Sequence, residues 1–132
     1  MPIGAAAGYS SFRMASAAFA HLEFDDYVVT FQNIEINFDS SVVTRQGEPV
    51  HLTRSEFDML RLLVENPGRA LDRDEILDSV WGQTATSTRT VDAHMLRLRR
   101  KLEDNPDEPG FLITVNKVGY MFVPDAKRQE AA

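Results

Sequence analysis

The sequence contains no cysteine. This absence excludes a disulfide framework and thiolate metal sites, and it fits a reducing compartment. No uninterrupted apolar run is long enough to span a bilayer. Residues 1–20 are rich in Ala and Ser with Arg13 as the one basic side chain, whereas a secretory signal needs a basic start and a stronger apolar centre. We therefore expect a cytoplasmic protein that has no membrane partner.

Signatures of catalysis are missing as well. The chain has no Gly-rich loop that would cradle a phosphate and no nucleophile motif. His21, Asp25 and Asp26 are of ligand type, but no spacing elsewhere in the sequence supports a metal site. We expect no enzyme, no metal and no cofactor.

The length of 132 residues suits one domain, and 43% hydrophobic and 26% charged residues are ordinary for a globular protein. We expect this domain over residues 28–125. Residues 1–27 are expected to be a partly disordered N-terminal extension, and residues 126–132 a polar tail.

The charge of the chain is unevenly distributed. A net charge of −6 argues against DNA binding if it is taken whole, but what matters near DNA is where the charges lie. From Arg89 to Lys101 there are five basic residues and one acid, a net charge of +4, so the remainder carries −10. The sequence therefore describes an acidic body with one basic strip.

Residues 28–52 have the pattern of a small antiparallel sheet. Short β-branched or aromatic runs are separated by turn residues at 32–33, 39–40 and 46–47. Ile34, Ile36 and Phe38 fall on one face at period two.

Two helices should follow, each with a marked start. Thr53 and Glu56 form a capping box for the first helix, and Asp72 and Glu75 form one for the second. Residues 66–68, Asn-Pro-Gly, end the first helix, and a glycine at position 82 ends the second. Trp81 lies on the apolar stripe of the second helix, so we expect it in the core.

A third helix is expected from about residue 88 to 102, and a hairpin at about 111–123. If the apolar stripe of this helix faces the core, a projection at about 100° per residue places every other side chain. The stripe is Val91, Met95, Leu98 and Leu102. The opposite side holds Arg89, Ala93, Leu96, Arg97 and Arg100, one edge holds Thr90, His94 and Lys101, and the other holds Asp92 and Arg99.

The outward face of this helix suits the major groove of DNA. Arginine pairs bidentately with guanine, and a small or apolar side chain meets a thymine methyl group. Other cations hold phosphates and fix the register. Basic residues on an amphipathic helix are more often a solvated face, but the order of sheet, three helices and hairpin favours a winged helix-turn-helix domain.

Several stretches of the sequence match the motifs of a known family, and they follow one another in the order in which that family has them. They are GEPVHLTRSEFDMLRLLVENPGRALDRDEIL, VWG, RTVDAHMLRLRRKLED and ITVNKVGYMF. From about residue 31 to 123 the chain resembles the C-terminal effector domain of OmpR/PhoB response regulators of two-component systems. The resemblance implies an α+β winged helix with a four-stranded N-terminal antiparallel sheet, a three-helix bundle and a C-terminal β-hairpin wing. It also implies that the domain regulates transcription by binding double-stranded promoter DNA, usually together with a second copy, with the pair on tandem direct repeats.

Site residues follow from the resemblance only where the motif matches. Residues 88–102 match the recognition helix for the major groove, with the hairpin wing at the adjacent minor groove. Arg89 and Thr90 resemble phosphate contacts, and Ala93 and Arg97 base-facing positions. His94, Arg99 and Arg100 match backbone contacts, although the projection puts Arg99 nearer the flank. Thr114 and Tyr120 match the wing, and the loop 83–87 matches a connection that touches RNA polymerase.

Two positions depart from the family pattern. The family commonly has Arg-Gly where this chain has Asn116-Lys117, so Lys117 would replace the minor-groove arginine, and Asn116 would adopt any left-handed conformation that the turn requires. Leu96 is an exposed leucine that would contact thymine methyl groups or pack on a neighbouring copy.

Two questions stay open in the sequence. Response regulators also have an N-terminal receiver domain, and the residues ahead of the effector fold are too few to form one. Either this is a fragment, or the regulator stands alone. The competing function is a winged helix that has lost DNA binding and holds an acidic protein partner with its basic strip. The overall acidity and the altered wing favour this hypothesis.

Overall fold

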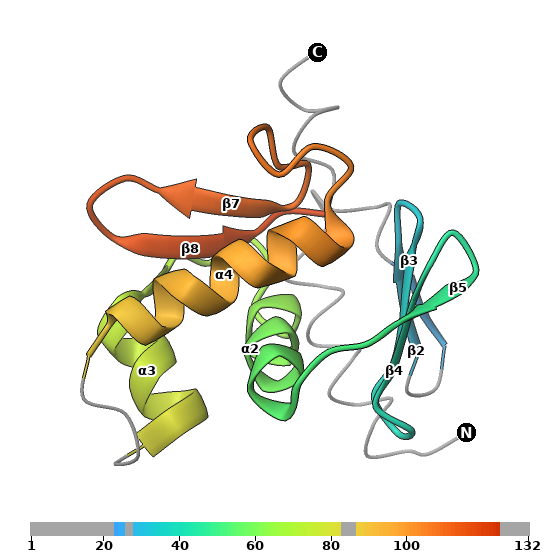
Figure 1. Cartoon of the computed structure of the whole chain (residues 1–132), viewed down its shortest axis with the longest axis horizontal. Coiled ribbons are helices and arrows are strands. Elements are labelled where there is room, and N and C mark those ends of the chain that lie inside the picture. The colour runs from blue at the N-terminus through green and yellow to red at the C-terminus, as the bar shows by residue number, and fades with distance from the viewer. Residues whose placement is uncertain (1–22, 26–27, 83–86, 125–132) are drawn as a thin grey trace.

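An antiparallel sheet forms the N-terminal part of the structure, a computed structural model that describes residues 23–25, 28–82 and 87–124 (Figure 1). Its strands pair in chain order, each antiparallel to the next. They are β1 (Glu23–Asp25), β2 (Val28–Phe31), β3 (Ile34–Asn37), β4 (Val42–Arg45) and β5 (Glu48–Val50). Ile34 and Ile36 are buried and Glu35 is exposed, as the alternation predicts.

Strand β1 was not expected. It lies within residues 1–27, which the sequence suggests are an extension, and it makes the sheet five-stranded where the resemblance implies four. Phe24 pairs with Val29 across the β1–β2 ladder. Three residues are too few for a period-two pattern to show, so only the backbone pairing reveals this strand. The expected disorder and the tail at 126–132 fall on residues outside those described.

Three helices follow the sheet, and the first two start directly after the predicted capping residues Thr53 and Asp72. They are α2 (Arg54–Val64), α3 (Arg73–Trp81) and α4 (Arg89–Leu102). Both bonds of the capping box join Thr53 and Glu56 at α2. At α3 only one bond of the predicted capping box is present, because the Asp72 side chain accepts from Glu75 N at 2.7 Å while the Glu75 carboxylate accepts from Arg69 instead.

A second sheet holds the C-terminal hairpin. Its order is β6 (Leu71–Asp72), β8 (Gly119–Phe122) and β7 (Leu112–Val115), with both pairs antiparallel. Gly119 faces Asp72 across the β6–β8 ladder, and a Cβ atom at this glycine would collide with the backbone of Leu71 and Asp72. Glycine at 119 therefore permits the close approach of the hairpin to the start of α3.

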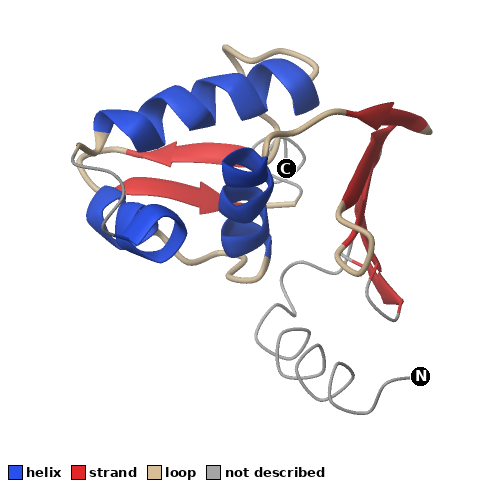
Figure 2. Cartoon of the chain, turned by 60° about the horizontal axis from the view of Figure 1, so that its bottom comes forward, coloured by secondary structure: helices blue, strands red, loops and turns tan. Residues whose placement is uncertain are grey.

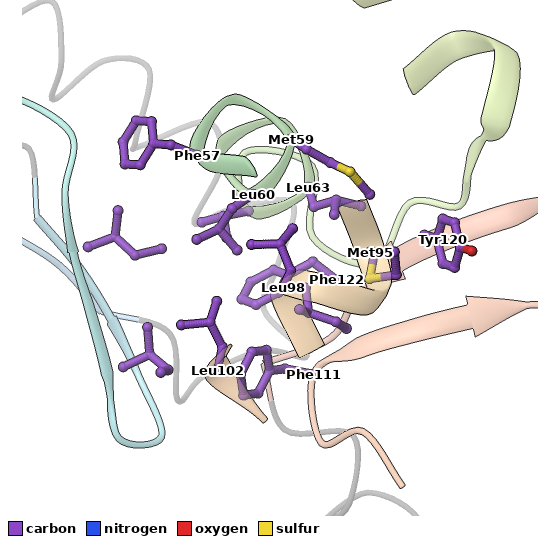
Figure 3. Close-up of a cluster of buried hydrophobic side chains, with 14 of the residues drawn as sticks. Phe57, Met59, Leu60, Leu63, Met95, Leu98, Leu102, Phe111, Tyr120 and Phe122 are labelled. Atoms are coloured by element: carbon purple, nitrogen blue, oxygen red, sulfur yellow. The ribbon is translucent and has the colours of Figure 1, made fainter. Parts of the chain in front are cut away.

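The helices and both sheets share one hydrophobic core (Figure 3). The predicted stripe of α4 is fully turned inward, since Val91, Met95, Leu98 and Leu102 are at most 1% exposed. Phe31 of β2 packs edge-on against Phe111 and Phe122, with ring centroids 5.0 and 4.7 Å away. These ring contacts join the N-terminal sheet to the base of the hairpin.

The N-terminal sheet and α3 lie at opposite ends of the molecule, with α4 running along the hairpin between them (Figure 2). Trp81 at the end of α3 is partly buried and packs against the core, close to expectation. None of the helices in the described ranges is long and apolar enough to cross a membrane. The same residues hold no cluster of three or more ligand side chains for a metal ion. His21 and Asp26 lie outside them.

Candidate nucleic-acid interface

The outward face of α4 is cationic. Arg89, Arg97 and Arg100 are exposed, and within residues 23–25, 28–82 and 87–124 no hydrogen bond or ion pair engages their side chains. Ala93 is half-buried beside them and Leu96 is exposed, as the projection predicts. The structure therefore leaves three guanidinium groups on this face free to meet an external anion.

One edge of α4 is attached to α3. His94 Nδ1 donates a hydrogen bond to Thr90 O at 2.8 Å, one turn earlier in the helix. The imidazole also packs edge-on against Trp81, with ring centroids 4.8 Å apart. Thr90 and His94 are half-buried. They flank the cationic face and hold the first turns of α4 in place.

Lys101 on the same edge points inward. Its ammonium group lies 2.6 Å from Glu56 Oε1, and the Glu56 side chain is only 1% exposed. Burial alone would raise the pKa of Glu56, but the bonds from Lys101 and from Thr53 N–H outweigh it and lower the pKa. Lys101 therefore neutralises a buried carboxylate and joins α4 to α2.

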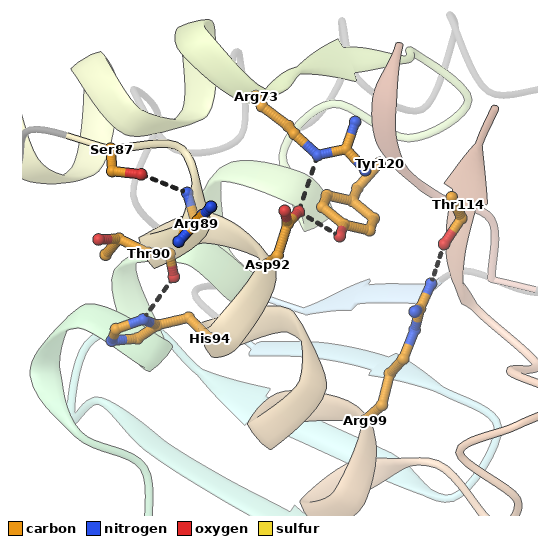
Figure 4. A network of polar contacts seen from close by, with 9 residues as sticks. All are labelled: Arg73, Ser87, Arg89, Thr90, Asp92, His94, Arg99, Thr114 and Tyr120. Carbon is orange, nitrogen blue, oxygen red and sulfur yellow. Dashed lines mark hydrogen bonds and ion pairs between the residues drawn. The ribbon is translucent and has the colours of Figure 1, made fainter. Parts of the chain in front are cut away.

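The other edge of α4 is joined to the wing through Asp92 (Figure 4). Asp92 Oδ1 accepts from Tyr120 Oη at 2.6 Å and from Arg73 Nε at 2.7 Å. Burial opposes ionisation of Asp92, yet these two donors lower its pKa below the ordinary value. The Tyr120 ring is contacted by two guanidinium groups, with Arg73 Cζ at 5.1 Å and Arg99 Cζ at 5.5 Å from its centroid. Tyr120 is 5% exposed, so its side chain belongs to the internal support of the wing.

Arg99 is bound to the wing as well. Its guanidinium donates to Leu112 O at 3.0 and 2.8 Å and to Thr114 Oγ1 at 2.7 Å. Burial lowers the pKa of Arg99. The resemblance suggests a DNA backbone contact at this position, whereas the structure places the group in contacts within the protein, as its flank position indicates.

Glu103 fixes the segment that leads into the wing. It is 3% exposed and accepts three backbone N–H groups, from Gly110 at 2.6 Å, Phe111 at 3.1 Å and Leu112 at 2.8 Å. Burial raises the pKa of Glu103 despite these donors and nearby Arg99. Because Glu103 directly follows α4, its carboxylate ties the helix end to β7.

The wing tip corrects one expectation. Asn116 was expected to take the left-handed conformation, but Lys117 has it, with φ of +65°. Val118 N donates to Val115 O at 3.0 Å, which makes Lys117 the third residue of a turn. A positive φ at that position is the requirement of a type II turn. Asn116, Lys117 and Val118 are exposed.

Some supporting residues have no signal in the sequence. Arg73 and Arg45 act across long chain separations, and Arg45 of β4 donates to Asp104 at 2.8 Å and to Lys101 O at 3.5 Å. Glu103 binds backbone N–H groups seven to nine residues later, across the loop that precedes β7. The loop 83–87 is described only at Ser87, whose hydroxyl accepts from Arg89 N at 3.1 Å. Residues 83–86 of the expected polymerase contact lie outside the described part.

Comparison with known proteins identifies the family to which this sequence is similar. Residues 47–122 match the family described as "Transcriptional regulatory protein, C terminal". The chain is 40% identical over 97 residues to the sensory transduction protein RegX3 of Mycolicibacterium smegmatis, covering 73% of this chain and 42% of that protein. It is 40% identical over 98 residues to the DNA-binding response regulator MtrA of the same species, covering 74% and 43%. The chain thus spans less than half the length of these curated relatives.

Solved structures agree in fold. The Klebsiella pneumoniae RstA DNA-binding domain in complex with the RstA box has a TM-score of 0.67 and 38% identity, covering 74% of this chain and 97% of that one. The Thermotoga maritima response regulator DrrB, an OmpR/PhoB homolog, has a TM-score of 0.70 and 29% identity, covering 86% and 49%. The winged-helix fold predicted from the sequence is therefore confirmed.

Proposed function

The chain belongs to the family of C-terminal domains of transcriptional regulatory proteins, and from this membership we infer that it binds double-stranded DNA sequence-specifically to regulate transcription. The observation that carries the inference is the outward face of α4. Its Arg89, Arg97 and Arg100 side chains have no partner among the described residues, although the chain as a whole has a net charge of −6. The phosphate groups of a DNA duplex are anions that can pair with these three arginines.

We assign α4 to the major groove and the hairpin wing to the adjacent minor groove. Arg97 and Ala93 would read base edges, since both lie on the outward face of the helix. Lys117 at the exposed wing tip would enter the minor groove beside Asn116. Phosphate contacts are assigned to the outer residues of the helix, which are Arg89, Thr90, His94 and Arg100.

Arg99, Thr114 and Tyr120 receive a different assignment within the same site. Arg99 donates to Thr114 and lies over the Tyr120 ring, so these three side chains set the distance between helix and wing. We treat them as positioning residues. A wing held in place before binding reduces the ordering cost of association.

Further partners rest on the resemblance. A second copy on tandem DNA repeats and RNA polymerase at the loop 83–87 are proposed on that ground, and the cytoplasm is the compartment that such a regulator requires. The second candidate function is a protein-interaction module that holds an acidic partner. The net charge of −6 and the altered wing, with Asn116-Lys117 in place of Arg-Gly, are the observations in its favour.

Binding to duplex oligonucleotides selected from a random pool, measured by fluorescence anisotropy, tests the inference. The logarithm of the affinity should fall with the logarithm of salt concentration at a slope of roughly −0.9 per phosphate contacted. Arg97→Ala should weaken the selected site by about 1–3 kcal/mol and relax the preference at one base position. Arg54→Ala is the matched control, because Arg54 is an exposed arginine of α2 outside the candidate interface.

Two outcomes would count against the assignment. Equal losses for Arg97→Ala on selected and on random duplexes would remove Arg97 from base reading. Absence of any salt-sensitive complex at micromolar protein would favour the protein-interaction module.

A further inference from the structure

Leu96 is an apolar side chain on a cationic face. It is 47% exposed, while the other aliphatic residues of α4 that form its stripe are buried. The described residues contain two other large hydrophobic side chains of similar exposure, Val42 and Val118, and neither lies on a helix. A single exposed leucine is ordinary on a protein surface, so what points to a contact is where Leu96 lies, on the outward face of α4 beside the free arginines.

The neighbours of Leu96 define what can approach it. Ala93 lies three residues before it and Arg100 four residues after it, so all three share one face of the helix. On the wing side, Leu96 borders a depression that is also lined by Arg99, Ile113 and Thr114 and by residues 106–109 of the loop before β7, which include the acids Asp107 and Glu108. Leu96 and Ala93 thus form an apolar spot beside the free arginines, and Leu96 is the residue of the pair that borders the depression on the wing side.

The chemistry of this face restricts the bases that it can read. Helix α4 contains no Asn or Gln, so the bidentate amide contact to adenine is not available from it. Arginine suits guanine. A leucine pressed against the polar edge of a base would deprive that edge of water without replacing its hydrogen bonds, which is costly. The apolar group that the major groove of unmodified DNA offers is the 5-methyl group of thymine.

We propose that Leu96, together with Ala93, packs against the 5-methyl group of a thymine and thereby selects this base within the bound site. The proposal rests on the proposed function, since it needs α4 to lie in a major groove. It adds a specificity-determining residue and names the group that it reads.

The test is a cycle of protein and DNA changes. The chain first selects a duplex from a random pool, and each thymine of that duplex is then replaced in turn by deoxyuridine, which lacks only the methyl group. At one position the replacement should weaken binding about fourfold, the factor that corresponds to burying one methyl-sized group. With Leu96→Ala the same replacement should have little effect. Val42→Ala, which trims a similarly exposed side chain on β4, should keep the full loss.

Each outcome decides something. Deoxyuridine losses of equal size in the wild type and in Leu96→Ala would overturn the role of Leu96, while selection of a duplex would still uphold DNA binding. Loss of cooperativity in Leu96→Ala on a two-site duplex, without any change on a single site, would instead assign the leucine to contact with a second copy. If no duplex is selected at all, the proposed function fails and the thymine contact fails with it. At the same position, tighter wild-type binding of a 5-methylcytosine–guanine pair than of a cytosine–guanine pair would show that the methyl group itself is read.

Discussion

Replacing Glu103 by glutamine should loosen the junction between α4 and the wing. The Glu103 carboxylate uses both oxygen atoms, because Oε1 accepts from Gly110 N and Oε2 accepts from Phe111 N and Leu112 N. An amide has one oxygen and one NH₂ group. If the amide oxygen serves Phe111 and Leu112, the NH₂ group must face the Gly110 N–H, and two donors then oppose each other.

The magnitude follows from these contacts. A buried donor without an acceptor costs about 1–3 kcal/mol, and the two remaining bonds weaken because their acceptor is no longer charged. Part of this loss is offset, since a neutral side chain avoids the burial that raises the pKa of Glu103. We expect Glu103→Gln to lower the free energy of unfolding by about 2 kcal/mol.

Urea unfolding followed by the fluorescence of Trp81, the one tryptophan of the chain, measures this change. Hydrogen exchange should accelerate at the amides of residues 110–112. The control is Glu108→Gln, which removes the same charge from an exposed position of the same loop. If both variants unfold at the same urea concentration and the three amides stay protected, the carboxylate is not what holds the wing.

Two further changes test the helix–wing contacts and the wing tip. Because the folded pKa of Asp92 lies below its ordinary value of 3.8, its contribution to stability is present above about pH 4 and is lost as the pH falls through the folded pKa. Asp92→Asn should therefore cost about 1 kcal/mol at pH 7, a figure reduced for partial exposure, and the difference from wild type in urea unfolding should shrink at pH 3; an unchanged difference would contradict it. Lys117→Gly should stabilise the domain by about 0.5–1 kcal/mol in urea unfolding, since a left-handed residue other than glycine costs about 1–2 kcal/mol and glycine returns part of that as entropy. Lys117→Ala retains the strain and should show no such gain.

The elements that the sequence predicts well are those whose causes lie within one turn of the chain. Thr53 and Glu56 bond each other across three residues, so the capping box needs nothing from the rest of the fold. The spacing of Val91, Met95, Leu98 and Leu102 requires only a helix and a core. This is why the start of α2 and the inward face of α4 are both confirmed.

The helix–wing contacts depend on partners that are distant in the sequence. A projection of α4 gives the direction of Arg99 and Lys101 but not the groups that they meet, which are Leu112 O and the Glu56 carboxylate. Arg73 is 19 residues from Asp92 in the chain, and Tyr120 is 28 residues from it. Only the packing of α3 and the hairpin against α4 brings these groups together, and no local pattern encodes it.

The wing tip shows how register overrides local preference. Asn is enriched among left-handed residues, so composition favours Asn116 for that conformation. Gly119 must face Asp72 because the two backbones approach too closely for a side chain, and this fixes where β8 begins. Val115 then pairs with Gly119, which leaves residues 116–118 for the turn and puts Lys117 at its third position. The pairing of Gly119 with Asp72 of β6 therefore determines that Lys117, and not Asn116, has the left-handed conformation.

The total charge of the chain is a poor guide to its surface for a related reason. Several acids are consumed inside the fold, since Glu56 pairs with Lys101, Asp92 with Arg73, and Glu103 binds backbone N–H groups. Each of these carboxylates is held by a partner within the fold and does not pair with the arginines on the outward face of α4. The same contacts stabilise the helix that carries this face. Among residues 23–25, 28–82 and 87–124, the basic side chains without a hydrogen bond or ion pair are Arg89, Arg97 and Arg100 on the outward face of α4 and Lys117 at the wing tip. A net charge of −6 and a DNA-binding surface are compatible because the same packing that supports α4 also sorts its charges.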